Sequence, residues 1–166
     1  MPEPGPSHVL DRIFQLTVTM SDAMREDLAK RGLTRPRATL MSHLHRGGPT
    51  TQSTLARALR VSPRNVTGLV NGLEALGLVE RTPHPTDGRA VLVRLTEDGS
   101  RAAAALRHDH VQLARYLFTG RKPAVLHELA SELDRLLQRL DDPAFAALRE
   151  QALQRWPLAA EAGSRP

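Results

Sequence analysis

The 166-residue chain contains no cysteine, and only 3% of its residues are aromatic. Without cysteine it has no disulfide, no zinc–thiolate site and no thiol redox switch. Because aromatic residues are scarce, leucine, valine and alanine must fill the core, which favours helices packed on helices. No run approaches the roughly 18 consecutive apolar residues of a membrane span, and the start of the chain lacks the basic and apolar regions of a signal peptide. These absences predict a cytoplasmic protein of one ordinary-sized domain.

The sequence also lacks the motifs of a catalytic centre. It has no glycine-rich phosphate loop, no cysteine nucleophile and no nucleophile-elbow context around a serine. Among seven histidines, His43 and His45 are two residues apart, as are His108 and His110, so a helix would point the members of each pair to different faces. We therefore expect no enzyme, no cofactor and no metal site. A zinc site assembled from several helices stays open as an alternative.

Lysine is scarce too, so arginine carries the positive charge, and the net charge is +5. From Arg31 to Arg101, eleven arginines accompany five acidic residues, which gives this segment a charge of +6 and the rest a charge of −1. Such confinement is expected if only the middle of the chain contacts a polyanion. Guanidinium groups form paired hydrogen bonds with phosphates and guanine edges. Genomic base composition would also explain arginine in place of lysine, but not its clustering.

Apolar residues at helical spacing predict a helix from His8 to Arg31 and a second helix, capped by Thr34, that ends at His45. Thr51 begins a third helix, and Ser62 with Pro63 begins a fourth that Gly77 ends. One face of the fourth helix is apolar, formed by Val66, Leu69, Val70, Leu73 and Leu76. The opposite face is polar and open, formed by Arg64, Asn65, Thr67, Gly68 and Asn71.

The second half of the chain begins with a predicted hairpin, because two β-prone runs, 78–82 and 90–95, flank a segment of turn-forming residues. Thr96 begins a fifth helix that extends to about Phe118, and a last short helix extends from Asp142 to about Arg155. Between them, a sixth helix carries leucines at spacings of 3 and 4, an a/d seam suited to a partner helix. The leucines of this seam are Leu126, Leu129, Leu133, Leu136 and Leu140.

The segment from Leu55 to Val66 has the pattern of a helix-turn-helix. Ala56 is small where the two helices approach closely, and the apolar residues Leu59, Val61 and Val66 fill the corner between them. The pattern alone is moderately specific. It becomes strong because Gly77-Leu78-Val79 and a hairpin follow at the distance typical of a winged helix-turn-helix.

On these stretches the chain resembles the multiple-antibiotic-resistance regulator (MarR) family of bacterial winged-helix repressors. The resemblance covers residues 34–107 and rests on the segments 51–56, 66–81, 87–89 and 95–99. It implies a mainly α fold with a small β-wing. In that fold a winged helix-turn-helix domain, 34–100, lies between dimerisation helices at 1–33 and 101–157, and a disordered tail follows at 158–166.

The resemblance also implies a function. The chain would be a homodimeric, sequence-specific transcriptional regulator that binds double-stranded DNA at a near-palindromic operator, with no membrane partner. By family likeness it would be a repressor that responds to a small-molecule effector. Two alternatives remain: a winged-helix module that uses the same face to bind protein, and a zinc-sensing regulator of the same fold.

Site residues follow from the matching positions. The recognition helix would read DNA through Ser62, Arg64, Asn65, Thr67, Gly68 and Asn71. The wing would use Arg81, His84, Asp87 and Arg89, with Arg89 in the minor groove, whose negative potential attracts arginine, and Asp87 helping to hold the wing tip. Phosphate contacts are predicted at Thr50, Thr51, Gln52, Arg57 and Arg60. Candidates for an effector pocket are Met20, Met24, Met41 and His45, although methionines at helical spacing also suit a core.

Two departures from the family pattern concern Arg60 and the end of the chain. Arg60 occupies the position between Leu59 and Val61 where the family often has glycine. If the turn needs a left-handed residue there, a non-glycine side chain costs about 1 kcal/mol; otherwise the turn has another shape. The helix after Asp142 extends past the usual end of the family.

Overall fold

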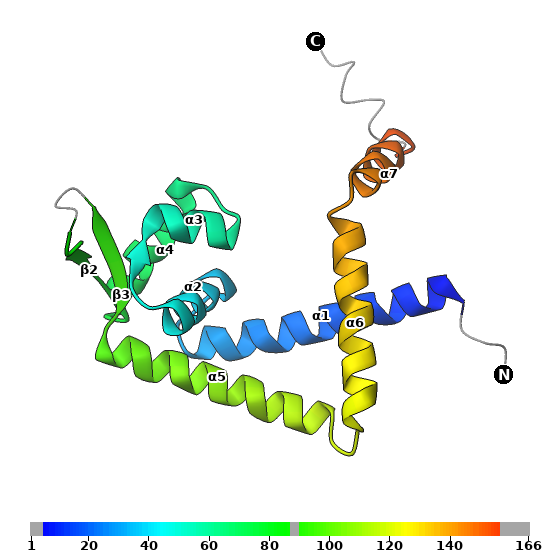
Figure 1. Cartoon of the computed structure of the whole chain (residues 1–166), viewed down its shortest axis with the longest axis horizontal. Helices are drawn as coiled ribbons and strands as arrows, with labels where there is room; N and C mark the ends of the chain where they lie inside the picture. Colours follow the sequence, from blue (N-terminus) through cyan, green and yellow to red (C-terminus); the bar gives the residue numbers. More distant parts are fainter. Residues whose placement is uncertain (1–4, 87–89, 157–166) are drawn as a thin grey trace, which may run out of the picture. The chain divides into compact units, whose positions relative to one another are not determined.

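A computed structural model describes residues 5–86 and 90–156 (Figure 1). The chain divides into two compact units after Ala114. The first unit contains, in chain order, α1 (Pro6–Lys30), α2 (Arg35–Gly47), β1 (Thr50–Thr51), α3 (Gln52–Leu59), α4 (Pro63–Glu74), β2 (Val79–Pro83), β3 (Val91–Leu95) and most of α5 (Glu97–Leu117). The second contains the end of α5, α6 (Pro123–Leu140) and α7 (Pro143–Gln154). The mainly helical fold with a small β-wing is confirmed.

The core of the first unit is aliphatic, as the scarcity of aromatic residues requires. Its most deeply buried side chains come from α2, α3, α4 and β3, and they are Leu40, Met41, Leu55, Val66, Val70, Leu73 and Val93. At about 25 cal/mol per Å² of apolar surface removed from water, each such side chain contributes about 1.5–3 kcal/mol. The core therefore fixes α4 by its inner face and leaves its outer face in solvent.

The sheet is antiparallel in the order β1-β3-β2. In the β2–β3 hairpin Val79 pairs with Leu95 and Pro83 with Val91, in agreement with the prediction. The third strand, β1, is only two residues long and pairs Thr50 with Val93. This strand was not predicted from the sequence, because two residues show no period and both threonines suited other roles.

Side-chain caps begin three of the helices where they were expected. Thr51 Oγ1 accepts from the backbone N–H of Thr54, and Ser62 Oγ accepts from that of Asn65. Thr96 Oγ1 accepts from the Gly99 N–H at the start of α5. Thr34 precedes α2 in an extended conformation, but its side chain forms no cap hydrogen bond, so that part of the prediction was wrong.

The end of α4 corrects the position of Leu76. The helix ends at Glu74, and the chain turns through Gly77, whose φ of +69° is left-handed. The backbone N–H of Leu78 donates to the Leu73 carbonyl, the bond of a Schellman motif. Leu76 therefore lies at the turn with 45% of its surface exposed, and it does not continue the apolar face that was predicted to include it.

Gly99 lies where α5 begins, directly against the backbone of the turn after α4. A Cβ atom built on Gly99 would lie 1.8 Å from the carbonyl oxygen of Leu78, much closer than any real contact. That carbonyl also accepts a hydrogen bond of 3.2 Å from the Thr96 N–H. Any side chain at position 99 would separate α5 from the strand that follows α4.

Gly99→Ala is therefore expected to lower the free energy of unfolding by about 1–3 kcal/mol, the usual cost of overpacking. Chemical denaturation measures the change. The matched control is Gly68→Ala, since a Cβ on Gly68 has no neighbour within 4 Å and alanine is favoured over glycine inside a helix by about 0.5–1 kcal/mol. Equal stability of the two variants would show that Gly99 of α5 is not packed tightly against the Leu78 carbonyl.

The second unit is helical, and α6 has no buried residue. Its seam residues Leu129, Leu133, Leu136 and Leu140 are each between 42% and 52% exposed, and Leu126 is half-buried. Within residues 5–86 and 90–156, no helix is long and apolar enough to span a membrane. The predicted tail, 158–166, lies outside the described residues.

Candidate DNA-binding surface and effector pocket

The turn between α3 and α4 has the left-handed geometry that the family pattern suggested. Arg60 has φ +54° and ψ +42°, the one non-glycine residue with positive φ in the described chain. The Val61 N–H donates to the Ala56 carbonyl, and the Arg60 N–H donates to that of Arg57, as in a Schellman motif. Arg60 thus occupies the position that glycine usually fills, at a cost of about 1–2 kcal/mol, and its side chain lies on the surface.

The outer face of α4 is fully open. Its predicted recognition residues are all exposed: Ser62, Arg64, Asn65, Thr67, Gly68 and Asn71. Ser62 caps the helix, and Arg64 lies in its first turn, the part of a recognition helix that meets base edges. The face is polar, and Gly68 has no side chain that would keep a base at a distance.

Gln52, at the start of α3, lies between Thr67 and Arg81. Its side-chain amide is 3.0 Å from Thr67 Oγ1 and 3.2 Å from both Nε and Nη2 of Arg81, and all three contacts are satisfied when Nε2 faces Thr67 and Oε1 faces Arg81. Thr67 Oγ1 in turn donates to the Pro63 carbonyl over 3.1 Å. Gln52, predicted as a phosphate contact, is therefore hydrogen-bonded within the protein.

Arg81, on β2, contacts α4 as well. Its Nη1 is ion-paired with Glu74 Oε2, and its Nη2 donates to Asn71 Oδ1 over 2.7 Å. The Arg81 and Glu74 side chains are only 29% and 32% exposed. The predicted wing residue Arg81 is thus bonded to the recognition helix, which the sequence analysis did not anticipate.

The wing continues beyond the strands to His84, whose N–H donates to the Ala90 carbonyl over 3.0 Å. His84 is half-buried, and its Nδ1 is 3.3 Å from the backbone nitrogen of Thr86. Asp87 and Arg89, the predicted wing-tip pair, lie outside the described residues. Their assigned contacts remain predictions.

The arginines between Arg31 and Arg101 differ in whether a carboxylate partner is present. One group is ion-paired with carboxylates, namely Arg31 with Asp109, Arg81 with Glu74, Arg94 with Glu80, and Arg101 with Glu97 and Asp98. By contrast, no ion pair among residues 5–86 and 90–156 joins Arg57 or Arg64 to a carboxylate. Both are exposed beside the α3–α4 turn, so positive charge without a carboxylate partner in the described part of the chain lies at the helix-turn-helix.

The residues predicted to contact phosphates differ in whether their side chains are buried or hydrogen-bonded within the protein. The hydroxyl of Thr51 caps α3 and also contacts Ser53 Oγ at 2.9 Å, while Thr50 is half-buried in β1. Arg57 is exposed, and its Nη2 lies 3.5 Å from Thr54 Oγ1. Of Thr50, Thr51 and Arg57, the exposed residue is Arg57.

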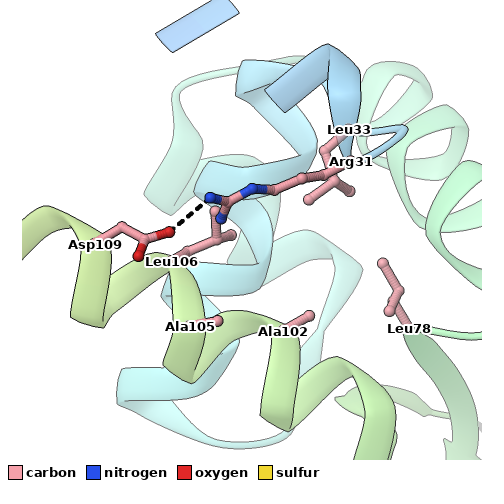
Figure 2. Close-up of a pocket in the computed structure, with 7 residues that line it drawn as sticks. All are labelled: Arg31, Leu33, Leu78, Ala102, Ala105, Leu106 and Asp109. Atoms are coloured by element: carbon pink, nitrogen blue, oxygen red, sulfur yellow. Dashed lines mark ion pairs between the residues drawn. The ribbon is translucent and has the colours of Figure 1, made fainter. Parts of the chain in front are cut away.

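A hollow of about 390 Å³ lies in the first unit, and no residue of α4 is in its lining (Figure 2). Its lining is apolar except for one ion pair, and consists of Arg31, Leu33, Leu78, Ala102, Ala105, Leu106 and Asp109. Arg31, after the end of α1, reaches to Asp109 of α5 at one side of the hollow, and Leu78 lies at the other. The distance from Arg31 Nη2 to Asp109 Oδ2 is 2.7 Å.

None of the four predicted pocket residues lines this hollow. Met41 is fully buried in the core, Met20 is half-buried, and Met24 and His45 are exposed. The sequence feature that corresponds to the observed hollow is a run of small residues in α5. These residues lie across the hollow from Leu33. In the described part of the chain, no three His, Asp or Glu residues gather as metal ligands would.

Comparisons with known proteins agree with this geometry. A family model described as the MarR family matches residues 31–90. An uncharacterized HTH-type transcriptional regulator of Mycobacterium bovis is 34% identical over 100 residues, which are 57% of this chain and 66% of that protein. The match thus spans just under two thirds of that relative's length. A further uncharacterized HTH-type regulator, from Bacillus subtilis, is 30% identical over 66% of this chain and 70% of its own length.

A relative with a named role is the HTH-type transcriptional repressor NicR of Pseudomonas putida, 33% identical over 52% of this chain and 58% of NicR. Among solved structures, Streptococcus pneumoniae FabT in complex with DNA has a TM-score of 0.75 at 18% identity, covering 83% of this chain and 99% of FabT. Bordetella bronchiseptica BpsR, whose DNA binding is regulated by 6-hydroxynicotinic acid, has a TM-score of 0.60 at 23% identity, covering 80% and 92%. Both likenesses concern the fold.

Proposed function

The chain belongs to the MarR family, and from this premise we propose that it is a homodimeric, sequence-specific transcriptional regulator that binds double-stranded DNA. The observation that carries the proposal is the outer face of α4, which is polar and exposed, and where Arg57 and Arg64 have no carboxylate partner among the described residues. Because its partner is DNA, the protein acts in the cytoplasm at the nucleoid.

The geometry supports a division of work between two grooves. The core holds α4 by Val66, Val70 and Leu73, so the helix enters a major groove as a rigid body and its first turn reaches base edges. The β2–β3 wing lies beside it and extends toward the adjoining minor groove, where Arg89 is the proposed contact. Arg57 and Arg60 flank the α3–α4 turn and contact phosphates, which fix orientation without reading sequence.

A second copy of the chain covers the apolar residues that α1 and α6 leave open. On α1 these include Leu10, Phe14 and Val18, which are 50%, 61% and 60% exposed and four residues apart, and on α6 they are the leucine seam. Exposed apolar surface of this extent marks an interface. A two-fold dimer presents two α4 helices about one DNA turn apart, roughly 34–36 Å, so the operator is near-palindromic.

We also propose repression that an effector relieves. NicR is named a repressor and the DNA binding of BpsR is regulated by 6-hydroxynicotinic acid, and the hollow between α5 and the segment after α1 has room for a molecule of that size. A ligand that prefers a dimer with another spacing between its winged helices shifts the population toward that shape and lowers DNA affinity.

A salt titration of duplex DNA binding tests the proposal against the protein-binding alternative. A dimer that neutralises about six to ten phosphates is expected to lose roughly 10³–10⁵ in affinity between 50 and 200 mM salt, because counterions are released on binding. Fluorescence anisotropy with a labelled genomic fragment measures the salt slope, which is the slope of log affinity against log salt concentration. A chain that binds no duplex at 50 mM salt, or binds it with no dependence on salt, is not the proposed regulator.

A further inference from the structure

We propose that Arg81 is a positioning residue, which sets base preference by holding the Asn71 side chain of the recognition helix and does not contact DNA itself. This inference rests on the proposed DNA-binding function, and it replaces the contact that the family resemblance predicted for Arg81. Its basis is the set of hydrogen bonds that joins β2, α3 and α4 under the outer face of α4.

Most of the donors of Arg81 are committed within the protein. A guanidinium group has three nitrogen atoms and no acceptor. Nη1 is paired with Glu74, Nη2 donates to Asn71 Oδ1 at 2.7 Å, and both Nη2 and Nε lie 3.2 Å from the amide of Gln52. Because four of its five N–H groups have acceptors and the side chain is only 29% exposed, a phosphate that took more than the remaining Nη1 hydrogen would have to displace these partners.

The partners of Arg81 lie on both helices of the helix-turn-helix. Glu74 and Asn71 are three residues apart on α4, so a planar fork reaches both from one side. Gln52 begins α3 and extends the set to Thr67 on the next turn of α4, over 3.0 Å. Two residues of the predicted reading face are therefore connected to the wing strand, Asn71 directly by Arg81 and Thr67 through Gln52.

The bond to Asn71 has a consequence for sequence reading. An asparagine that recognises adenine uses Oδ1 to accept from N6 and Nδ2 to donate to N7. In this protein Arg81 donates to Oδ1, which assigns the oxygen of this exposed side chain to the protein and leaves Nδ2 as its donor. Asn71 is thereby suited to bases that present acceptors in the major groove, such as guanine O6 and N7 or thymine O4. If Arg81 is removed, the lone pair of Oδ1 that it occupies becomes available to the amino group of adenine or cytosine.

The test is binding-site selection and salt titration with the full-length Arg81→Met variant. The expected result is a loss of roughly tenfold discrimination at one position of each half-site. Adenine or cytosine becomes more frequent at that position in the selected sequences. The salt slope equals that of the wild type. Asn71→Ala should relax the same position. The matched control is Arg94→Met, because Arg94 lies on β3, is paired with Glu80 among the described residues and is 51% exposed. That control should leave the motif unchanged.

Three results overturn the inference and are distinct from one another. A salt slope that falls by about one unit per lost contact, with an unchanged motif, makes Arg81 a phosphate contact. Equal loss of affinity for all sequences, with an unchanged slope and motif, makes its role structural only. A wild-type chain that enriches no motif overturns the proposed function and the inference with it. Should Arg81→Met be unfolded by circular dichroism, Arg81→Lys, which keeps the charge but lacks the planar fork, is read by the same criteria.

Discussion

Leu133→Asp is expected to convert the dimer into monomer or unfolded chain and to abolish DNA binding at the same time. Leu133 is at the centre of the leucine seam of α6 and is 44% exposed in the single chain. In a dimer that buries this seam, the aspartate would be removed from water without a partner, which costs several kcal/mol for each protomer. Sedimentation velocity and light scattering measure the assembly state, and anisotropy on the same samples measures DNA binding.

The control for this change is Gln138→Asp. Gln138 is exposed on α6, and the 3.6-residue period places it on the face opposite the seam. The Gln138→Asp substitution introduces the same side chain on the same helix, and this variant should remain a dimer that binds DNA. A Leu133→Asp variant that stays dimeric would move the interface away from α6, with the apolar residues of α1 as the next candidate.

Arg64→Ala is expected to relax base preference at one position in each half-site, with a loss of about 1–3 kcal/mol of discrimination per contact. Arg64 is exposed in the first turn of α4 and has no carboxylate partner in the described chain. Arg60→Ala should instead lower affinity for all sequences alike, because a phosphate contact carries no sequence information. Its salt slope should fall by about one unit per contact, and twice that in a dimer.

The two arginines are compared by binding-site selection and salt titration, side by side. Arg60→Gly serves as a further control, since it removes the same charge but also the strain of a left-handed residue at φ +54°. Agreement of the alanine and glycine variants in salt slope assigns the effect to charge. If Arg64→Ala leaves the selected motif untouched, the register of the recognition helix is wrong, and Asn65 or Asn71 is the better candidate.

The local parts of the fold were predictable because short segments determine them. Ser62 with Pro63, and Thr96, mark helix starts by capping chemistry that depends on the next three residues. The inner face of α4 follows from the helical period alone. Even the left-handed Arg60 was expected as one of two alternatives, from the glycine that the family has at that position.

The polar connections between segments were not predictable from the sequence. Arg81 bonds to partners seven, ten and 29 residues before it, and nothing local indicates which acceptors an arginine will meet. For the same reason, the arginine cluster was read as one positive surface, whereas Arg31, Arg94 and Arg101 are paired with carboxylates. The pocket candidates were chosen by residue type, and the observed hollow depends on how α5 packs.

The most direct test of sequence-specific binding by a two-fold dimer is selection of bound duplexes from a random DNA pool with the wild-type chain. The account predicts one enriched, near-palindromic motif whose half-site centres lie about one helical turn, roughly 10 base pairs, apart. Enrichment of a single half-site, or of no sequence above the starting pool at low salt, would contradict it.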